Sequence, residues 1–352
     1  MKTSKAIVFE RPKKPGIQTI RLPEVDETTI VVKTRYSAIS TGTEMKVYNG
    51  ITCSLDGNLW YPLVPGYEEV GEVVYVGEKA PPTYTGEKLR VGDRVMANEV
   101  RRYPDHCAAW GGQVELAVKN GKTAGAPFDR CAKIPDGVSY QEAAVAYLAC
   151  VAKKGMDKVG VRPGETVLVV GMGCIGLAAV QLARLAGAEK VIAMDVAESR
   201  LKNAARYTDC LINAKTANVL KVLAEMTDNK LADVIFEASG NSRVASQVHQ
   251  YLKDGGWDRG DDGGRIHFQG DYPDPVVFSP YWKWYNKNMR ISMTCAIGPG
   301  DKEAVLDLIA QKKLEVRSQI TREVSVDEAP GAYEDLNNNR EDILKILLRW
   351  QA

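Results

Sequence analysis

The chain has 352 residues, of which 45% are hydrophobic, and its 46 Lys and Arg residues against 45 Asp and Glu give a formal net charge of +1. This length suits about two domains with separate cores, and the apolar content excludes a mainly disordered chain. A net charge this close to zero gives no long-range field for polyanions, so we expect no nucleic-acid partner.

The N-terminal segment and the cysteines indicate a reducing compartment. The segment MKTSKAIVFERPKK has no apolar core long enough for a secretory signal, and the 7 cysteines are scattered without a Cys-x-x-Cys pair. The longest uncharged stretch, residues 166–183, could imitate a membrane span by length, but its spaced glycines favour a strand, a turn and a helix. We therefore expect a cytoplasmic protein with no membrane contact.

Residues 1 to about 145 alternate short apolar or β-branched runs with Gly and Pro turns. Short strands at this spacing predict an all-β, barrel-like domain. The runs expected to form strands are residues 5–9, 29–36, 69–76 and 94–97.

From about Tyr140 the pattern changes to helices alternating with strands, which predicts a doubly wound parallel sheet. The predicted strands are residues 166–170, 190–194, 210–212, 232–237 and 265–268. The predicted helices are residues 141–155, 174–186, 199–207, 217–227 and 242–252. After residue 301 the alternation ends with two helices (302–311 and 329–338) and a strand (343–348), a tail that could return to the first domain.

The most informative segment is VLVVGMGCIG at residues 167–176. An apolar strand, a Gly-x-Gly-x-x-Gly turn and a helix-forming run follow one another, as in a dinucleotide-binding turn. The first glycine permits the tight turn, the second leaves room for a diphosphate, and the third lets the helix pack on the strand. The free N–H groups at the start of this helix then face the phosphates. The candidate cofactor residues here are Gly171, Gly173, Cys174, Ile175 and Gly176.

Asp195 ends the next predicted strand, 19 residues after Gly176. A carboxylate at this position accepts hydrogen bonds from the ribose hydroxyls and repels a 2′-phosphate, so NAD is favoured over NADP. Alternatively, Asp195 only caps the following helix. Arg200 would either lie over the adenine or be a solvated helix residue.

The order of these motifs resembles that of the medium-chain dehydrogenase/reductase superfamily over nearly the whole chain. The matching segments besides the glycine turn are STGTE at 40–44, PGYEE at 65–69, VGDRV at 91–95, GG at 111–112, GGRIH at 263–267, ITR at 320–322 and EAPGAY at 328–333. The resemblance implies an α/β fold class, with a GroES-like β-barrel catalytic domain (residues 1–146 and 299–352) and a Rossmann domain (147–298).

Zinc-binding members of this superfamily place a cysteine and a histidine in the first of these motifs and a second histidine in the next. The resemblance implies that Thr41, Lys46 and Tyr67 stand at those positions here, and that Ala146 stands at the third ligand position. Thr, Tyr and Ala cannot supply the thiolate, imidazole or carboxylate groups that zinc requires, and the chain has only 3 histidines. We therefore expect no zinc.

Within the superfamily, the chain is similar to the zinc-free branch that includes bacteriochlorophyllide a dehydrogenase. The shared strings are ISTGTE at 39–44, YPLVPGYE at 61–68 and GDYPDPV at 270–276. The chain departs from this branch where a Thr-x-x-His segment is expected, because it reads CVAKK at 150–154.

Oxidation of an alcohol by NAD requires a group that accepts the hydroxyl proton and stabilises the developing alkoxide. Lys153 is a candidate, because burial lowers the pKa of a lysine. It lies three residues after Cys150 on the same helix face, and the resemblance places Cys150, like Thr41, near the nicotinamide. The alternative is an amphipathic helix that exposes Lys153 and Lys154 to water.

Tyr67 is the second candidate, because a residue at a former ligand position should face the same cavity. Its phenol could donate to a carbonyl or relay a proton, with a nearby lysine stabilising the phenolate, or it could only fill the space of the metal. Thr43 and Lys46 could form an outward proton relay, although Lys46 could equally be a surface residue.

Three further polar residues have a structural interpretation. We expect Glu44 and Glu68 to hold loops by accepting hydrogen bonds from backbone or arginine groups. His267 ends a strand near the expected cofactor, but it could equally be a satisfied core histidine.

Aromatic residues supply the clues to the substrate. Flat rings beside polar groups suit sugars or cyclitols, and they equally suit a macrocycle. The candidates are Trp60, Trp110 and Trp282, of which Trp282 could instead pack in an interface. Residues 257–264 resemble an inserted polar loop, and residues 290–297 an edge strand that pairs with a second copy in a homodimer.

Together these features predict a zinc-independent, NAD-dependent oxidoreductase that interconverts a secondary alcohol, such as a sugar, cyclitol or other polyol, and its ketone. Two alternatives stay open. The enzyme could oxidise a hydroxyethyl group on a bacteriochlorophyll precursor, or the chain could be a non-catalytic NAD-binding sensor or structural subunit.

Overall fold

The computed structural model describes residues 2–51, 59–98, 102–120, 129–256 and 263–350. It divides into two compact units, one formed by Met1–Tyr147 with Gly298–Ala352 and the other by Leu148–Ile297. This division places Tyr147 and Gly298 in the first unit, one residue from the boundary expected at each junction. Most of the polar loop expected at 257–264 lies outside the described residues.

The first unit contains two β-sheets. The larger has the order β16-β17-β3-β5-β6-β9, with β8 paired to β3. Its strands are β3 (Ile30–Ile39), β5 (Glu68–Val76), β6 (Arg94–Met96), β8 (Leu116–Lys119), β9 (Ala132–Lys133), β16 (Arg322–Ser325) and β17 (Ile346–Arg349). The smaller, in the order β2-β1-β4-β7, consists of β1 (Thr3–Arg11), β2 (Lys14–Arg21), β4 (Leu63–Val64) and β7 (Cys107–Ala108).

The C-terminal tail returns to the first unit, as predicted. Strand β17 pairs antiparallel with β3, so that Leu347 stands opposite Ala38. The helices of this unit are α1 (Thr43–Tyr48), α8 (Asp301–Ala310), α9 (Ala329–Asn338) and the short η3 (Arg317–Gln319) and η4 (Val326–Glu328). Helix α2 (Tyr140–Val159) begins in this unit and continues into the other.

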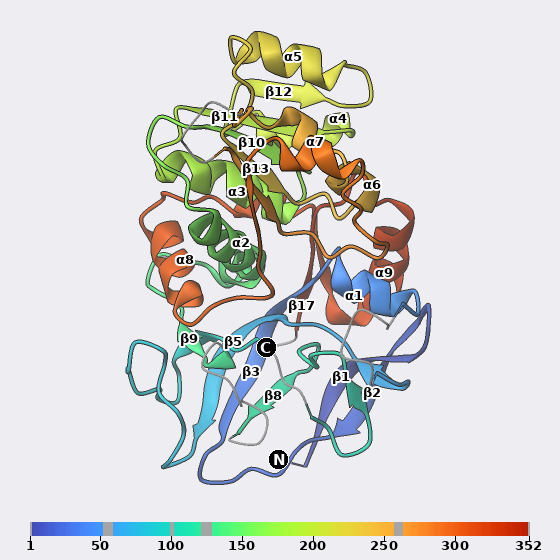
Figure 1. Ribbon diagram of the computed structural model, residues 1–352. Coiled ribbons are helices and arrows are strands. Elements are labelled where there is room, and N and C mark those ends of the chain that lie inside the picture. The colour runs from blue at the N-terminus through green and yellow to red at the C-terminus, as the bar shows by residue number, and fades with distance from the viewer. Residues whose placement is uncertain (1, 52–58, 99–101, 121–128, 257–262, 351–352) are drawn as a thin grey trace. The chain divides into compact units, whose positions relative to one another are not determined.

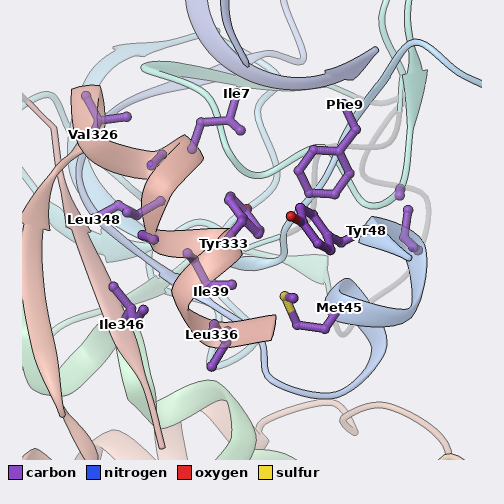
Figure 2. Close-up of a cluster of buried hydrophobic side chains, with 14 of the residues drawn as sticks. Ile7, Phe9, Ile39, Met45, Tyr48, Val326, Tyr333, Leu336, Ile346 and Leu348 are labelled. Atoms are coloured by element: carbon purple, nitrogen blue, oxygen red, sulfur yellow. The ribbon is translucent and has the colours of Figure 1, made fainter. Parts of the chain in front are cut away.

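An aromatic core joins the N-terminal strand to the returning tail (Figure 2). Tyr333 on α9 packs edge-on to Phe9 on β1, with ring centroids 5.0 Å apart, and stacks on Tyr48 of α1 at 5.8 Å. All three side chains are buried. This packing fixes α1 against α9, and therefore also positions the turn at residues 40–42 that precedes α1.

The second unit is a six-stranded parallel sheet in the order β12-β11-β10-β13-β14-β15. Figure 1 labels four of its strands, β10 to β13. Its strands are β10 (Thr166–Val170), β11 (Lys190–Asp195), β12 (Cys210–Asn213), β13 (Val234–Glu237), β14 (Arg265–Phe268) and β15 (Arg290–Met293). Numbered along the chain within this unit, the strands lie in the order 3-2-1-4-5-6, which is the doubly wound arrangement. The order in which successive strands are added to the sheet reverses between β10 and β13. The predicted α/β fold class is thus confirmed.

Helices connect these strands. They are α3 (Cys174–Leu185), α4 (Glu198–Ala204), α5 (Val219–Met226), α6 (Ser242–Ala245), η2 (Val248–Tyr251) and α7 (Tyr281–Tyr285). Three of them, α3, α4 and α5, lie at nearly the predicted positions. The uncharged stretch 166–183 forms β10, the glycine turn and most of α3, as expected. In the described part of the chain, no helix is both long and apolar enough to cross a membrane.

The continuous helix predicted over 242–252 is wrong, because α6 ends at Ala245 and a separate turn, η2, follows. The Ser246 hydroxyl bonds back to the Ser242 carbonyl at 2.7 Å and accepts the N–H of Val277 at 2.8 Å. A serine that bonds its own backbone competes with helix continuation, and the tertiary contact holds it there.

The edge strand is also shorter than the predicted range 290–297, because β15 ends at Met293. Beyond it, the Lys154 ammonium donates to the carbonyl oxygens of Cys295 and Ile297 at 2.6 and 3.2 Å. These carbonyl groups are therefore satisfied by a side chain of α2 rather than by a sheet ladder.

Candidate functional site

The glycine turn between β10 and α3 is built around missing side chains. Gly171 has a φ of +90°, and a Cβ there would lie 2.7 Å from the Ser239 Cα. A Cβ on Gly176 would lie 1.8 Å from the Gly171 carbonyl oxygen. Both positions must therefore be glycine for the turn to form.

Gly173 differs from these two glycines, since its φ of −75° suits any residue. The nearest atom to a Cβ at this position is the Arg200 Nη1, 3.6 Å away. Gly173 is also the N-cap of α3, and no side chain caps the helix there. The protein itself does not need a glycine here, whereas a diphosphate approaching the N–H groups at the start of the helix does. This cradle fits a dinucleotide.

Asp195 ends β11 beside this turn and accepts three backbone hydrogen bonds. Its Oδ2 accepts from Met172 N at 2.6 Å, and its Oδ1 accepts from Val196 N at 2.7 Å and from Ala197 N at 2.9 Å. The carboxylate therefore connects the glycine turn with the start of α4. Its bonds to Val196 N and Ala197 N agree with the alternative in which Asp195 caps the following helix. Its two oxygens offer about four acceptor positions, so capacity for a ribose hydroxyl remains.

Arg200 on α4 is half-buried, and its guanidinium lies beside Gly173. The turn residues Cys174 and Ile175 begin α3, Cys174 buried and Ile175 half-buried. The structure thus gathers Arg200, Asp195 and the three glycines at the carboxyl ends of β10 and β11.

The segment at Cys150 lies within α2, as predicted. Cys150 is buried, and the Lys153 ammonium, with its side chain 22% exposed, lies 2.5 Å from the Asp157 carboxylate one turn later. Lys154 instead holds the carbonyl groups after β15, so the alternative of two solvated lysines is wrong for Lys154. The role of Lys153 in proton transfer stays a prediction.

Tyr67, in the turn before β5, is buried in an aromatic box. Its ring packs edge-on to Trp110 at 5.0 Å and tilted against Tyr147 at 4.9 Å, and its hydroxyl bonds to Ser40 Oγ. Burial, together with the nearby Glu68 carboxylate, raises the pKa of Tyr67 well above its usual value. The phenol is therefore a proton donor rather than a phenolate.

Glu68, the residue after Tyr67, forms a buried ion pair with a lysine. The Lys345 ammonium donates to both Glu68 oxygens at 2.7 and 2.9 Å, and both side chains are fully buried. Burial raises the pKa of Glu68, and the Lys345 charge opposes this shift. The lysine cation is thus neutralised by a carboxylate, and the expected arginine or backbone partner of Glu68 is wrong.

Glu44, on α1, is buried in a second polar group. It accepts hydrogen bonds from Ser40 N at 3.0 Å, from Gln113 Nε2 at 3.3 Å and from the Tyr333 hydroxyl. Burial raises the pKa of Glu44 to about 7. The expected backbone donor is confirmed, and the other donors are an amide and a phenol rather than an arginine.

The remaining candidates of the first unit lie at different depths. Thr41 and Lys46 are half-buried, in the turn before α1 and on α1, and Thr43 bonds to the Tyr67 hydroxyl. Trp110 has a φ of +70°, a strained conformation for a bulky residue that is found preferentially at functional positions. Trp60 is 52% exposed, so only Trp110 among the predicted substrate residues is shown to contact Tyr67.

Two candidates of the second unit also have clear surroundings. His267 is buried, with its ring nitrogens 2.9 Å from Ser292 Oγ and 3.0 Å from Gln269 Oε1. It is thus a satisfied core histidine, as the structural alternative predicts. Trp282 is 59% exposed on α7.

The residues at the positions of the zinc ligands do not fit a zinc ion. The Ala146 side chain is buried in α2 and has no donor atom, and burial raises the pKa of Tyr67 well above its usual value. Within the described ranges, no three His, Cys, Asp or Glu side chains lie together in a way that could hold a metal. Zinc prefers thiolate, imidazole or carboxylate ligands, and this donor set offers none of them.

Sequence comparison identifies two protein families in the chain. Residues 26–154 match the alcohol dehydrogenase GroES-like domain, and residues 174–311 match the family described as zinc-binding dehydrogenase. A 2-desacetyl-2-hydroxyethyl bacteriochlorophyllide A dehydrogenase from Cereibacter sphaeroides is 30% identical over 349 residues, which is 99% of this chain and 98% of that protein. A probable D-xylulose reductase A from Aspergillus clavatus is 30% identical over 82% of this chain and 84% of that protein.

Structure comparison supports the same fold. A crystal structure of an oxidoreductase/dehydrogenase of unknown specificity from Escherichia coli matches with a TM-score of 0.83 and 21% identity, over 99% of this chain and 100% of that chain. Family membership implies a nicotinamide dinucleotide cofactor, and the cradle at Gly173 fits one. On these matches and on the glycine turn, the chain belongs to the medium-chain dehydrogenase/reductase superfamily.

Proposed function

We propose that this protein is a zinc-independent, NAD-preferring oxidoreductase that interconverts a secondary alcohol and its ketone. The observation that carries the proposal is the buried Tyr67, which stands in place of a metal ligand and whose hydroxyl bonds to Ser40. Asp195 at the end of β11 supports the preference for NAD, since a carboxylate there repels a 2′-phosphate.

When bound, NAD supplies the hydride acceptor or donor, and the side chains of this protein manage the proton. In ketone reduction, Tyr67 would donate its hydroxyl proton towards the carbonyl oxygen, with Ser40 and Thr43 as the next hydroxyls in the relay. In the opposite direction, alcohol oxidation, Lys153 is a proposed proton acceptor. Lys46 would connect the hydroxyl relay outward. These groups would replace the charge stabilisation that a metal ion otherwise gives.

We propose a sugar, cyclitol or other polyol as the substrate class. The name of the D-xylulose reductase relative supports a polyol, and Trp110 beside Tyr67 offers a flat apolar face next to a hydrogen-bond donor, which suits a sugar ring. The name of the C. sphaeroides relative supports the second candidate, a hydroxyethyl group on a bacteriochlorophyll precursor.

The test is a panel of sugars, cyclitols, simple alcohols and a chlorophyllide, with nicotinamide reduction followed with NAD and with NADP. Turnover of a polyol with NAD is expected, and turnover of the chlorophyllide alone would favour the second candidate. Turnover of no member, together with NAD binding, would favour a non-catalytic sensor or structural subunit. One tightly held zinc per chain in the same preparation would overturn the zinc-free part.

Lys153→Met tests the proposed proton acceptor on α2. We expect it to abolish turnover and to leave the Kd for NAD unchanged. Lys153 forms an ion pair with Asp157, and neither residue belongs to the glycine turn. Asp157→Asn, which removes only the ion-pair partner, is the matched control and should retain turnover. Undiminished turnover of Lys153→Met would remove this residue from the mechanism.

We also propose a cytoplasmic homodimer that forms through β15. The six cysteines among the described residues are thiols rather than disulfides, which suits a reducing compartment. Strand β15 is the edge of its sheet, and its Met293 is 61% exposed. Such an edge is open to pairing with a second copy. Light scattering at micromolar concentration should give twice the mass of one chain, and a single-chain mass would reject the dimer.

A further inference from the structure

The segment after β14 is fastened to the end of the neighbouring strand β13. The Tyr272 hydroxyl donates to Glu237 Oε2, and the Tyr272 ring packs edge-on to Phe268 at 6.2 Å. Gly270 makes this possible, because a Cβ there would lie 2.7 Å from the ring carbon Cζ of Tyr272. The ring thus folds back over a glycine to reach the carboxyl group.

Glu237 continues this connection to the glycine turn. It is the last residue of β13, is fully buried and lies opposite Val170 in the parallel ladder, directly before Gly171. Its Oε1 accepts from Ser239 N at 3.0 Å and from the Ser239 hydroxyl. The Ser239 backbone is in turn the group that a Cβ on Gly171 would strike. Tyr272, Glu237 and Ser239 therefore form one continuous contact chain to the diphosphate turn.

The position of this contact chain on the sheet indicates what it serves. In a doubly wound sheet, a dinucleotide lies across the carboxyl ends of the strands where the strand order reverses, here between β10 and β13. Asp195 on β11 belongs to the half that receives the adenosine. The carboxyl ends of β13 and β14, where Glu237 and Tyr272 meet, belong to the other half.

We infer that Tyr272 and Glu237 are positioning residues that hold the segment after β14 in place for the nicotinamide half of the dinucleotide. This inference rests on the proposed function, because it assumes that the cradle binds NAD. Burial raises the pKa of Glu237, and the hydrogen bonds from Ser239 and Tyr272 oppose this shift.

Two variants break the contact in different ways. Tyr272→Phe keeps the ring and removes the donor, whereas Gly270→Ala leaves both partners intact and displaces the ring. Tyr251→Phe, the same chemical change on η2 of this unit, is the matched control. For each protein, calorimetry measures the Kd for NAD and for AMP, which contains only the adenosine half, and thermal unfolding checks the fold.

We expect both variants to raise the Kd for NAD by about tenfold, near the upper value of one neutral hydrogen bond, and to change the Kd for AMP by less than about twofold. Tyr251→Phe should change neither constant. Unchanged NAD binding in both variants, or an equal loss for AMP and NAD, would overturn the inference. Wild-type protein that binds neither nucleotide would instead overturn the proposed function.

Discussion

The two units build their candidate functional groups in opposite ways. The glycine turn of the second unit consists of backbone N–H groups and absent side chains, within residues 171–176 and the nearby Asp195. The Tyr67 region of the first unit consists of buried side chains whose partners are remote, since Glu44 and Tyr333 are separated by 289 positions and Glu68 and Lys345 by 277. The first kind of site is read from a motif, whereas the second exists only after folding.

Because the two sites are built differently, different kinds of substitution should disrupt them. A backbone site fails when an atom is added, as at Gly176, because there is no space for it. A buried polar site fails when an atom is removed, as at Lys345, because its partner is left without compensation. Each prediction below tests one side of this contrast.

Lys345→Met should give the largest effect, because it leaves the Glu68 carboxylate buried without its cation. We expect a loss of about 3–5 kcal/mol in the free energy of unfolding, measured by urea denaturation at neutral pH. The double variant Lys345→Met with Glu68→Gln should recover most of this loss. A loss below about 1 kcal/mol would show that the pair is not buried in solution.

Glu44 should make stability depend on pH in the direction opposite to most carboxylates. Its pKa of about 7 in the folded state lies above the ordinary 4.5, so its stabilising contribution is complete below about pH 4.5 and is lost as the pH rises through 7. Relative to Glu44→Gln, the wild type should lose about 3 kcal/mol of unfolding free energy between pH 4.5 and 8. The exposed Glu10→Gln serves as the control, and parallel profiles for wild type and Glu44→Gln would contradict the prediction.

Tyr67→Phe tests whether the phenol handles the proton. We expect kcat to fall by about 100-fold with the Kd for NAD unchanged, since a general acid contributes at least this much. Tyr75→Phe, on β5 of the same unit, should keep its activity. The pKa of Tyr67 lies well above its usual value, so the titration of Tyr67 should not cause a loss of activity at alkaline pH. Any such loss that the wild type shows should therefore also appear in Tyr67→Phe.

Gly173→Ala and Gly176→Ala sharpen the comparison at the backbone site. Gly173→Ala should raise the Kd for NAD at least about tenfold and leave the unfolding free energy unchanged, since its Cβ meets no atom closer than 3.6 Å. Gly176→Ala should raise the Kd for NAD and also lower the free energy of unfolding, because its Cβ would lie 1.8 Å from a carbonyl oxygen. Normal NAD binding by Gly173→Ala, measured by calorimetry, would refute the diphosphate cradle.

The sequence by itself determined the second unit almost strand by strand. Strands β10 and β14 have the predicted bounds, and α3 begins at the predicted Cys174. These elements follow from periodicity and from glycine sterics within about 20 residues of chain. The glycine turn and Asp195 were predictable for the same reason.

Only the tertiary structure decided which groups face one another. It paired Lys345 with Glu68, placed Tyr333 on Glu44 and brought Tyr272 to Glu237. It also ended α6 at Ala245, where the next residue, Ser246, contacts Val277. Local pattern indicates that a residue is buried, but the partner of a buried charge or hydroxyl is chosen by packing between distant segments. The hydrogen-bond requirement of the buried group then selects among the neighbours that packing supplies.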